Sequence, residues 1–196
     1  MLEKAAVALT EFMYKKGAIS ISKRPIFIYG FQLTISALCS TLSILTISIF
    51  LGKPLSALMF FIVFFWIRLF SGGFHANTYL KCFFLTNALY LLVVLASEVF
   101  SHLSSIPILL STQIISGIIV ISFAPIRHKN HPLSEAVYIR NQKVSRWLVA
   151  VFELLFPFIS FLTDSLIWMS LFSASLMAVA ILMIIPKIQE RRDLCE

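Results

Sequence analysis

Residues 55–82 read LSALMFFIVFFWIRLFSGGFHANTYLKC, which is an apolar run followed by a compact group of reactive residues. The run over 55–70 is long enough to cross the hydrocarbon core of a bilayer as a helix. The stretch 68–82 then combines an arginine, a glycine pair, a histidine and a cysteine. Glycine ends helices readily because it adopts positive φ without steric cost. The sequence therefore predicts a membrane helix that stops at Gly72 and Gly73, followed by a turn that carries polar side chains.

The composition places the rest of the chain in a membrane as well. Hydrophobic residues make up 59% of the 196 residues, charged residues only 13%, and the mean hydropathy is +0.93. A chain with so little polar surface cannot cover a soluble globule of this size. We predict six transmembrane segments, at residues 26–51, 55–70, 79–103, 106–124, 144–162 and 165–185. Their continuous apolarity favours helices, so the predicted fold is an all-α polytopic membrane protein with a single domain over residues 1–196.

The N-terminal residues 1–25 predict a helix of a different kind. They lack the pattern of a secretory signal peptide, so the first span is expected to serve as the insertion signal itself. Residues 2–16 place apolar side chains at helical spacing, which is typical of an amphipathic helix. This helix either lies in the membrane interface or packs on the end of the bundle, and the sequence leaves both interpretations open.

The basic residues predict the orientation of the spans. If successive loops lie on opposite sides, the N-terminal region, the 68–81 connection, the 125–146 loop and the C-terminal tail share one side. That side holds 15 of the 16 Lys and Arg residues, and only Lys53 lies on the other. The positive-inside rule then predicts that both termini, the central motif and the basic loop are cytoplasmic. Topology and contact with anionic lipid account for the net charge of +7, so no nucleic-acid partner is predicted.

The spacing of His75 and Cys82 limits the chemistry between them. Seven residues on a straight helix separate the two side chains by about 10 Å along the axis, whereas proton transfer needs a contact of about 3 Å. We therefore expect His75 to lie on a bent segment that folds over the start of the helix carrying Cys82. Asn77 or Thr78 is the expected N-cap of that helix. The helix N-terminus and the neighbouring Lys81 would then favour a thiolate at Cys82.

Each part of this motif also has an ordinary interpretation. A membrane cysteine is often a small apolar packing residue, a loop histidine is often solvated, and a glycine pair can form a plain turn between two helices. Arg68 either binds a substrate carboxylate or oxyanion, or anchors its helix at the interface. The three cysteines show no disulfide framework. No metal or other cofactor is predicted, because one His and one Cys lack the paired spacing of zinc ligands.

The combined pattern R-x3-G-G-x-H-A-x5-C is formed by Arg68, Gly72, Gly73, His75, Ala76 and Cys82. This pattern resembles that of the AgrB family, the accessory gene regulator B proteins of Gram-positive bacteria. The chain length, the six predicted spans and a basic loop over 124–133 also match, so the resemblance covers nearly the whole chain. It implies a multi-pass cysteine endopeptidase of the bacterial cell membrane that processes a quorum-sensing precursor peptide.

The resemblance also implies roles for these residues. Cys82 would attack the peptide bond before the acidic C-terminal tail of the precursor and form an acyl-enzyme thioester, with His75 as the base. A Cys or Ser of the substrate would then displace the enzyme thiol and close a thiolactone or lactone ring. Gly73 would shape the site. Arg68 and Gly72 are further candidate supporting residues from the pattern of the motif itself. A homodimer is expected from the resemblance alone, since no clear face of small residues predicts self-association.

The basic loop 125–146 offers a second candidate site. Its candidates for docking the acidic tail of the precursor are Arg127, Lys129, Arg140 and Lys143. The alternative is that these residues only retain the loop in the cytoplasm and contact lipid. A competing function for the whole chain is a non-enzymatic transporter or export factor that recruits an acidic peptide through its basic loops.

Glu153 is expected near the middle of the fifth span, where an ionisable group is costly and usually faces the interior of the bundle. It is a candidate supporting residue, either as a third member that orients His75 or as a partner of Arg68. Alternatively, it is a neutral carboxyl group bonded to a neighbouring helix. Pro157 follows one turn later and is expected to leave the Glu153 carbonyl without its helical donor.

Overall fold

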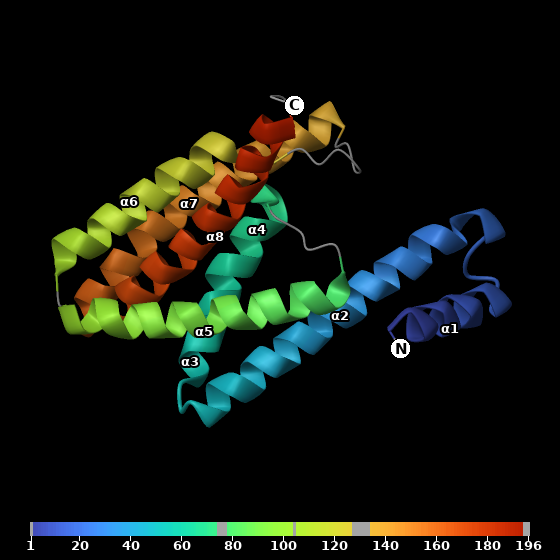
Figure 1. The fold of residues 1–196 in the computed structure, drawn as a ribbon, viewed down its shortest axis with the longest axis horizontal. Helices are drawn as coiled ribbons and strands as arrows, with labels where there is room; N and C mark the ends of the chain where they lie inside the picture. Colours follow the sequence, from blue (N-terminus) through green and yellow to red (C-terminus); the bar gives the residue numbers. More distant parts are fainter. Residues whose placement is uncertain (1, 74–77, 104, 127–133, 194–196) are drawn as a thin grey trace. The chain divides into compact units, whose positions relative to one another are not determined.

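The computed structural model describes residues 2–73, 78–103, 105–126 and 134–193. All regular structure in these residues is helical, with no strand, which confirms the all-α prediction (Figure 1). They belong to two compact units, one formed by residues 1–52 and 76–88 and the other by residues 53–75 and 89–196.

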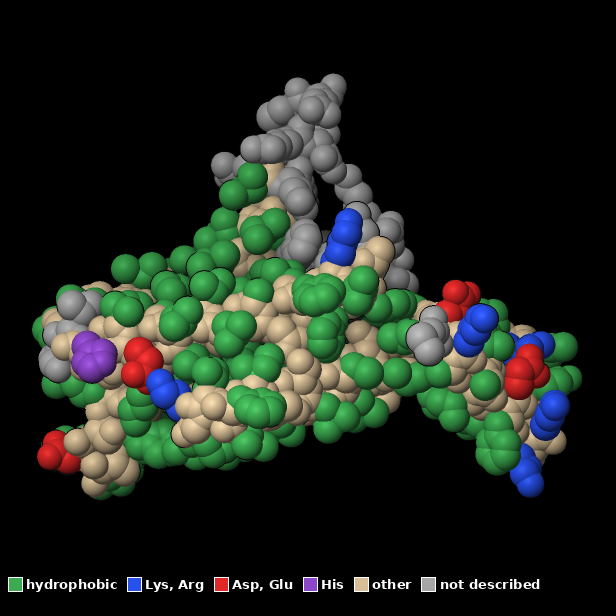
Figure 2. Space-filling view, turned by 60° about the horizontal axis from the view of Figure 1, so that its bottom comes forward, with side chains coloured by type: hydrophobic (Ala, Val, Ile, Leu, Met, Phe, Trp, Pro, Cys, Tyr) green, Lys and Arg blue, Asp and Glu red, His purple; other side chains and the backbone are tan. Residues whose placement is uncertain are grey.

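The six predicted spans are confirmed by helices that are long and apolar enough to cross a membrane. Within the described part of the chain these are Ile21–Phe50, Pro54–Ser71, Tyr79–His102, Ile106–Phe123, Glu135–Thr163 and Ile167–Ile188. Figure 2 shows hydrophobic side chains over most of the visible face, with charged side chains confined to small groups. Both observations indicate a multi-pass membrane protein.

The first unit contains α1 (Leu2–Lys15), the short 3-10 helix η1 (Ile21–Lys23), α2 (Arg24–Phe50) and the start of α5 (Tyr79–Leu103). Ala6 and Thr10, one helical turn apart, are fully buried where α1 packs on α2. The large apolar side chains of α1 point elsewhere, since Leu9 is 44% exposed and Phe12 is 62% exposed. The predicted N-terminal helix is therefore present and leaves Leu9 and Phe12 exposed, and its place in the membrane interface stays a prediction.

Two polar contacts join the start of α5 to α2 within this unit. The Tyr79 hydroxyl donates to Gln32 Oε1 at 3.0 Å, and the Ser43 hydroxyl donates to Asn87 Oδ1 at 2.8 Å. Hydrogen bonds between side chains hold membrane helices together because the surrounding lipid offers no alternative partner. These contacts fix the helix segment that carries Cys82 against α2.

The second unit begins with a helix of irregular winding. It runs as α3 (Pro54–Phe60), a π-helical turn η2 (Phe61–Phe65) and α4 (Trp66–Ser71). A π turn shifts the register of the residues that follow it, and such turns occur frequently at functional sites. The register of α4, which carries Arg68, therefore differs from that of an uninterrupted α-helix.

The core of the second unit is α8 (Ile167–Asp193), which packs with α6 (Ile106–Phe123) and α7 (Glu135–Thr163). In the most apolar part of α8, 72% of the residues are buried, compared with 17–44% in the other five spans. Small residues on α8 are buried in this packing: Ser170, Ser173, Ala174, Ser175, Ala178 and Ala180. Small side chains let helix backbones approach closely in membranes, which explains the central place of α8.

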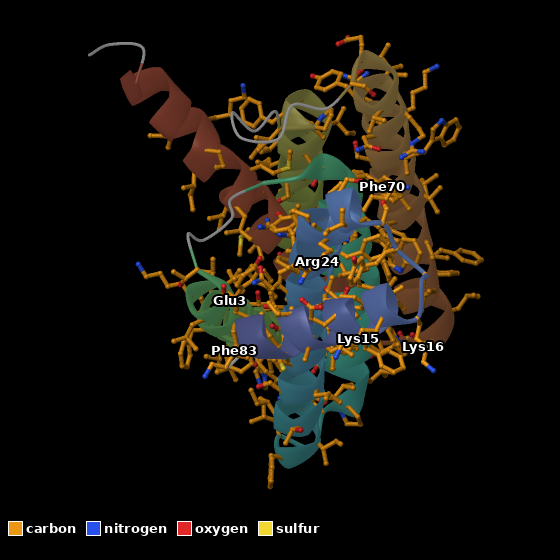
Figure 3. All side chains as sticks on the ribbon, turned by 90° about the vertical axis from the view of Figure 1, so that its right-hand side faces the viewer. Glu3, Lys15, Lys16, Arg24, Phe70 and Phe83 are labelled. Atoms are coloured by element: carbon orange, nitrogen blue, oxygen red, sulfur yellow. The ribbon has the colours of Figure 1, made fainter. Side chains whose placement is uncertain are left out.

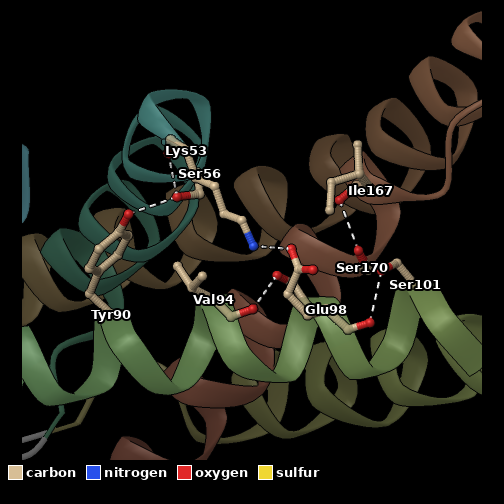
Figure 4. Close-up of polar contacts among 9 residues, drawn as sticks. Lys53, Ser56, Tyr90, Val94, Glu98, Ser101, Ile167 and Ser170 are labelled. Atoms are coloured by element: carbon tan, nitrogen blue, oxygen red, sulfur yellow. Dashed lines mark hydrogen bonds and ion pairs between the residues drawn. The ribbon is translucent and has the colours of Figure 1, made fainter. Parts of the chain in front are cut away.

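An ion pair and a hydrogen bond join the start of α3 to the later part of α5 (Figure 4). Lys53 Nζ is 2.5 Å from Glu98 Oε1, and the Ser56 and Tyr90 hydroxyls are 2.7 Å apart. Lys53 is the single basic residue that the topology prediction assigns to the outer side. Its charge is thus paired with a carboxylate of the neighbouring span.

Two helices extend beyond their predicted ends. α7 begins at Glu135 instead of residue 144, and α8 ends at Asp193 instead of residue 185. Hydropathy marks only the apolar part of a helix, whereas polar helix formers such as Glu, Gln, Lys and Arg continue it outside the bilayer. The predicted basic loop 125–146 is correspondingly shorter, because its residues from Glu135 onward are helical.

Candidate active site

Cys82 lies at the start of α5, where the helix is capped by Thr78. The Lys81 N–H donates to Thr78 Oγ1 at 3.3 Å, and the Cys82 N–H donates to the Thr78 carbonyl at 3.0 Å. Thr78, one of the two expected caps, therefore fills that role. Cys82 is a free, half-buried thiol next to the positive end of the helix dipole.

His75, the predicted base, and Asn77 fall in residues 74–77, outside the described residues. The helix that carries Cys82 begins at Tyr79. A single straight helix through both residues would have held the two side chains too far apart for direct proton transfer. The role of His75 stays a prediction.

α4 ends at a turn that favours glycine. Gly72 has φ 70° and ψ −150°, and Gly73 has φ 133°. Residues with a Cβ rarely adopt such backbone angles, which cost about 1–3 kcal/mol when they do. The helix therefore ends at Ser71, where the glycine pair predicts it.

Arg68 lies against this turn. A Cβ built on Gly73 would be 2.7 Å from Arg68 Nη1 and 3.4 Å from the carbonyl oxygen of Leu182 on α8. The guanidinium carbon of Arg68 is 5.6 Å from the centre of the Phe64 ring, a cation–π distance. The missing side chain at Gly73 thus leaves the space that the half-buried guanidinium occupies.

The start of the basic loop is tied to the same turn. The Ile126 N–H donates to the Ser71 carbonyl at 3.0 Å, and a Cβ on Gly72 would be 3.5 Å from the Ile126 carbonyl oxygen. Ala124 and Ile126 are buried. The 68–81 connection and the 125–146 segment therefore begin at the same end of the second unit, as the predicted topology requires.

The predicted docking residues of the basic segment fall in two groups. Arg140 and Lys143 are exposed on the first turns of α7. Arg127 and Lys129 lie in 127–133, outside the described residues. The exposed pair is available to a ligand in solution, and its role in docking stays a prediction.

Glu153 is half-buried on α7 and faces α6. A Cβ built on Gly117 would be 2.6 Å from Glu153 Oε1 and 3.4 Å from Val149 Cγ1. Oε1 is buried and has no hydrogen-bond partner among the described residues. Gly117 provides the space for the Glu153 carboxyl group. The two roles suggested for Glu153, as a partner of Arg68 or as a residue that orients His75, stay predictions.

Gly117→Ala is expected to raise the thermal unfolding midpoint of the wild-type chain by less than the preference of helices for alanine over glycine, about 1 kcal/mol, would give. The added Cβ would force the Glu153 carboxyl group to move, which offsets part of that gain. In a Glu153→Ala background the same substitution should raise the midpoint further, because no carboxyl group is displaced. A double-mutant cycle on purified protein should give an interaction energy of about 0.5–3 kcal/mol. Equal shifts in both backgrounds would contradict this account.

Three contacts of the site were not predicted from the sequence. Phe64 lies four residues before Arg68, a spacing that places both on one helix face, so a signal for this contact was present. The contacts with Leu182 and Ile126 join segments far apart in the chain, and no local pattern marks them. Among the described residues no group of three or more His, Cys, Asp or Glu side chains could hold a metal ion.

Comparison with known proteins agrees with the resemblance seen in the motif. A sequence model of one family, accessory gene regulator B, matches residues 6–185. The matched region includes the whole stretch 68–82, Glu153 and the basic segment 125–146. Neither the curated proteins nor the solved structures yielded a match.

Proposed function

The chain belongs to the accessory gene regulator B family of membrane proteins involved in autoinducer processing, and on this basis we propose that it is a cysteine endopeptidase. It cleaves a short precursor peptide before an acidic C-terminal tail and closes the new carboxyl end into a thiolactone or lactone ring. The observation that carries this proposal is the free thiol of Cys82 at the capped N-terminus of α5.

In the first step the Cys82 sulfur attacks the carbonyl carbon of the scissile peptide bond. The carbon–nitrogen bond breaks, a carbon–sulfur bond forms, and the tail leaves as an amine. His75 takes the thiol proton and delivers it to the departing nitrogen. The product is an acyl-enzyme thioester, and no oxidant, reductant or metal ion takes part in the balance.

In the second step a thiol or hydroxyl group within the bound peptide attacks the thioester carbonyl. The enzyme's carbon–sulfur bond breaks, the ring bond forms, and the proton of the substrate nucleophile returns to Cys82. A thioester keeps most of the reactivity of an acyl donor, so the second transfer needs no further activation. An apolar surrounding that limits water favours ring closure over hydrolysis.

Arg68 is proposed to bind a substrate carboxylate or the oxyanion. Its guanidinium group lies over the Phe64 ring and fills the space next to Gly73, so the group is already oriented before substrate binds. Arginine suits this role because its planar fork can donate two parallel hydrogen bonds to a carboxylate. Arg140 and Lys143, exposed on α7, are proposed to attract the acidic tail.

The site is proposed to face the cytoplasm, where a newly made precursor peptide arrives. The bond between Ser71 and Ile126 supports this assignment, because it places two basic connections at one end of the second unit. The basic residues of both connections then lie on the side that the positive-inside rule favours.

Coexpression with a candidate precursor tests the proposed function. The peptide should carry a central Cys and an acidic C-terminal tail, and mass spectrometry should follow the products in membranes that contain the chain. The expected products are the free tail and a ring that is lighter than the hydrolysed fragment by one water molecule. If the intact precursor persists in the presence of a normally inserted chain, the chain does not cleave that peptide, and failure with every such precursor would overturn the proposal.

A further inference from the structure

The first unit contains a groove at the start of α2 that the peptidase chemistry does not use. Its volume is about 480 Å³, and it is lined by Ile21, Arg24, Pro25, Ile28, Tyr29 and Gln32. We propose that this groove binds an anionic phospholipid, with the phosphate on Arg24 and an acyl chain along the apolar lining. Such a lipid would hold α1 and the start of α2 at the headgroup level of the bilayer.

Arg24 is positioned for this role by α1. Its Nη2 forms an ion pair with Glu11, and its guanidinium carbon is 5.4 Å from the centre of the Tyr14 ring. The side chain is 31% exposed, and its Nε has no hydrogen-bond acceptor among the described residues. A guanidinium group has five N–H donors, so the contact with one carboxylate leaves donors for a phosphate.

The charge of the surroundings favours an anionic lipid over a zwitterionic one. Exposed Lys15 ends α1, exposed Lys16 follows it, and exposed Lys23 precedes Arg24. Residues 11–24 therefore hold four basic residues and a single acidic residue, Glu11. Figure 3 shows Lys15 and Lys16 at one end of α1 and Glu3 near the other. Basic residues next to a span attract the anionic headgroups of the cytoplasmic leaflet.

The apolar part of the groove suits an acyl chain. Ile21, which lines the groove, is 64% exposed, and Ile26 is 69% exposed on the same helix, which is long and apolar enough to cross the bilayer. Side chains of this size and exposure require an apolar neighbour, which the lipid tails supply. The groove therefore joins a cationic end at headgroup depth to an apolar wall below it, the chemistry of one phospholipid molecule.

Native mass spectrometry of the full-length chain in mixed micelles tests the inference. The probes are phosphatidylglycerol and phosphatidylcholine with identical acyl chains. The wild-type chain should retain one phosphatidylglycerol in preference to phosphatidylcholine. Arg24→Gln should weaken that retention about tenfold or more, the scale of losing a hydrogen bond to a charged group. Lys4→Gln is the matched control, because it removes the same charge from an exposed position of α1 outside the groove.

Equal loss in the Arg24→Gln and Lys4→Gln variants would show diffuse attraction and overturn the site, as would a wild-type chain without lipid preference. Ile28→Trp should fill the groove while keeping the ion pair of Arg24, so unchanged retention in this variant would also contradict the inference. Inorganic phosphate should not displace the lipid, and displacement would show that the headgroup alone is recognised. None of these readouts depends on peptidase activity.

Discussion

Cys82→Ser is expected to lower the release of the acidic tail by about 10³-fold or more, the scale of losing the attacking nucleophile of a catalytic unit. A serine hydroxyl group is a much weaker nucleophile than a thiol, so it forms the acyl-enzyme far more slowly. The capped start of α5 would persist, because Thr78 and the backbone make the cap. Tail release from a coexpressed precursor, normalised to the amount of inserted chain, measures the effect.

Cys39→Ser provides the matched control for this experiment. Cys39 is an exposed free thiol in the middle of α2, so the same atom is changed away from the helix terminus. Its variant should process the precursor at the wild-type rate. Processing that survives Cys82→Ser would favour the transporter or export factor, which needs no nucleophile at that position.

Gly73→Ala is expected to reduce both stability and processing. The backbone at φ 133° is strained for any residue with a Cβ, at a cost of about 1–3 kcal/mol. The new methyl group would also lie 2.7 Å from the present position of Arg68 Nη1 and displace the guanidinium. A displacement of about 1 Å in a group that positions the substrate can lower the rate about 10²-fold. Thermal unfolding and tail release together measure the two effects.

Two other glycines separate the causes of that loss. Gly30→Ala places a Cβ with no atom within 4 Å in the interior of α2, and processing should be unchanged. Gly17→Ala has the same open space but a φ of 70°, so it should cost stability without affecting Arg68. If Gly17→Ala impairs processing as strongly as Gly73→Ala, strain alone explains the loss and the role assigned to Arg68 is wrong.

The spans and their order could be predicted because apolar length is a local property. The segment predicted at 79–103 coincides with α5, and Thr78 was among the expected caps, since capping depends on residues next to the helix. The glycine pair likewise marked the end of α4. These features follow from short-range rules of backbone conformation and transfer into lipid.

Long-range packing could not be predicted in the same way. The contacts of Gly117 with Glu153 and of Ser71 with Ile126 depend on which segments become neighbours in the fold. The π turn η2 is not marked by any particular residue type, since its sequence is as apolar as the helix around it. One local pattern does mark a packing face. Ser170, Ala174 and Ala178 repeat at four-residue spacing on α8, and the structure buries them inside the second unit. That face of small residues explains packing within the chain and does not bear on a dimer.

The central claim, that Cys82 carries the peptide as a thioester, is tested most directly by trapping that intermediate. The purified full-length chain should be mixed with a precursor whose ring-forming Cys or Ser is replaced by alanine, so that the second transfer cannot occur. The account predicts a covalent adduct with the mass of the peptide lacking its tail, located on Cys82 by fragmentation and released by hydroxylamine. Tail release with no adduct on Cys82, or an adduct on another residue, would contradict it.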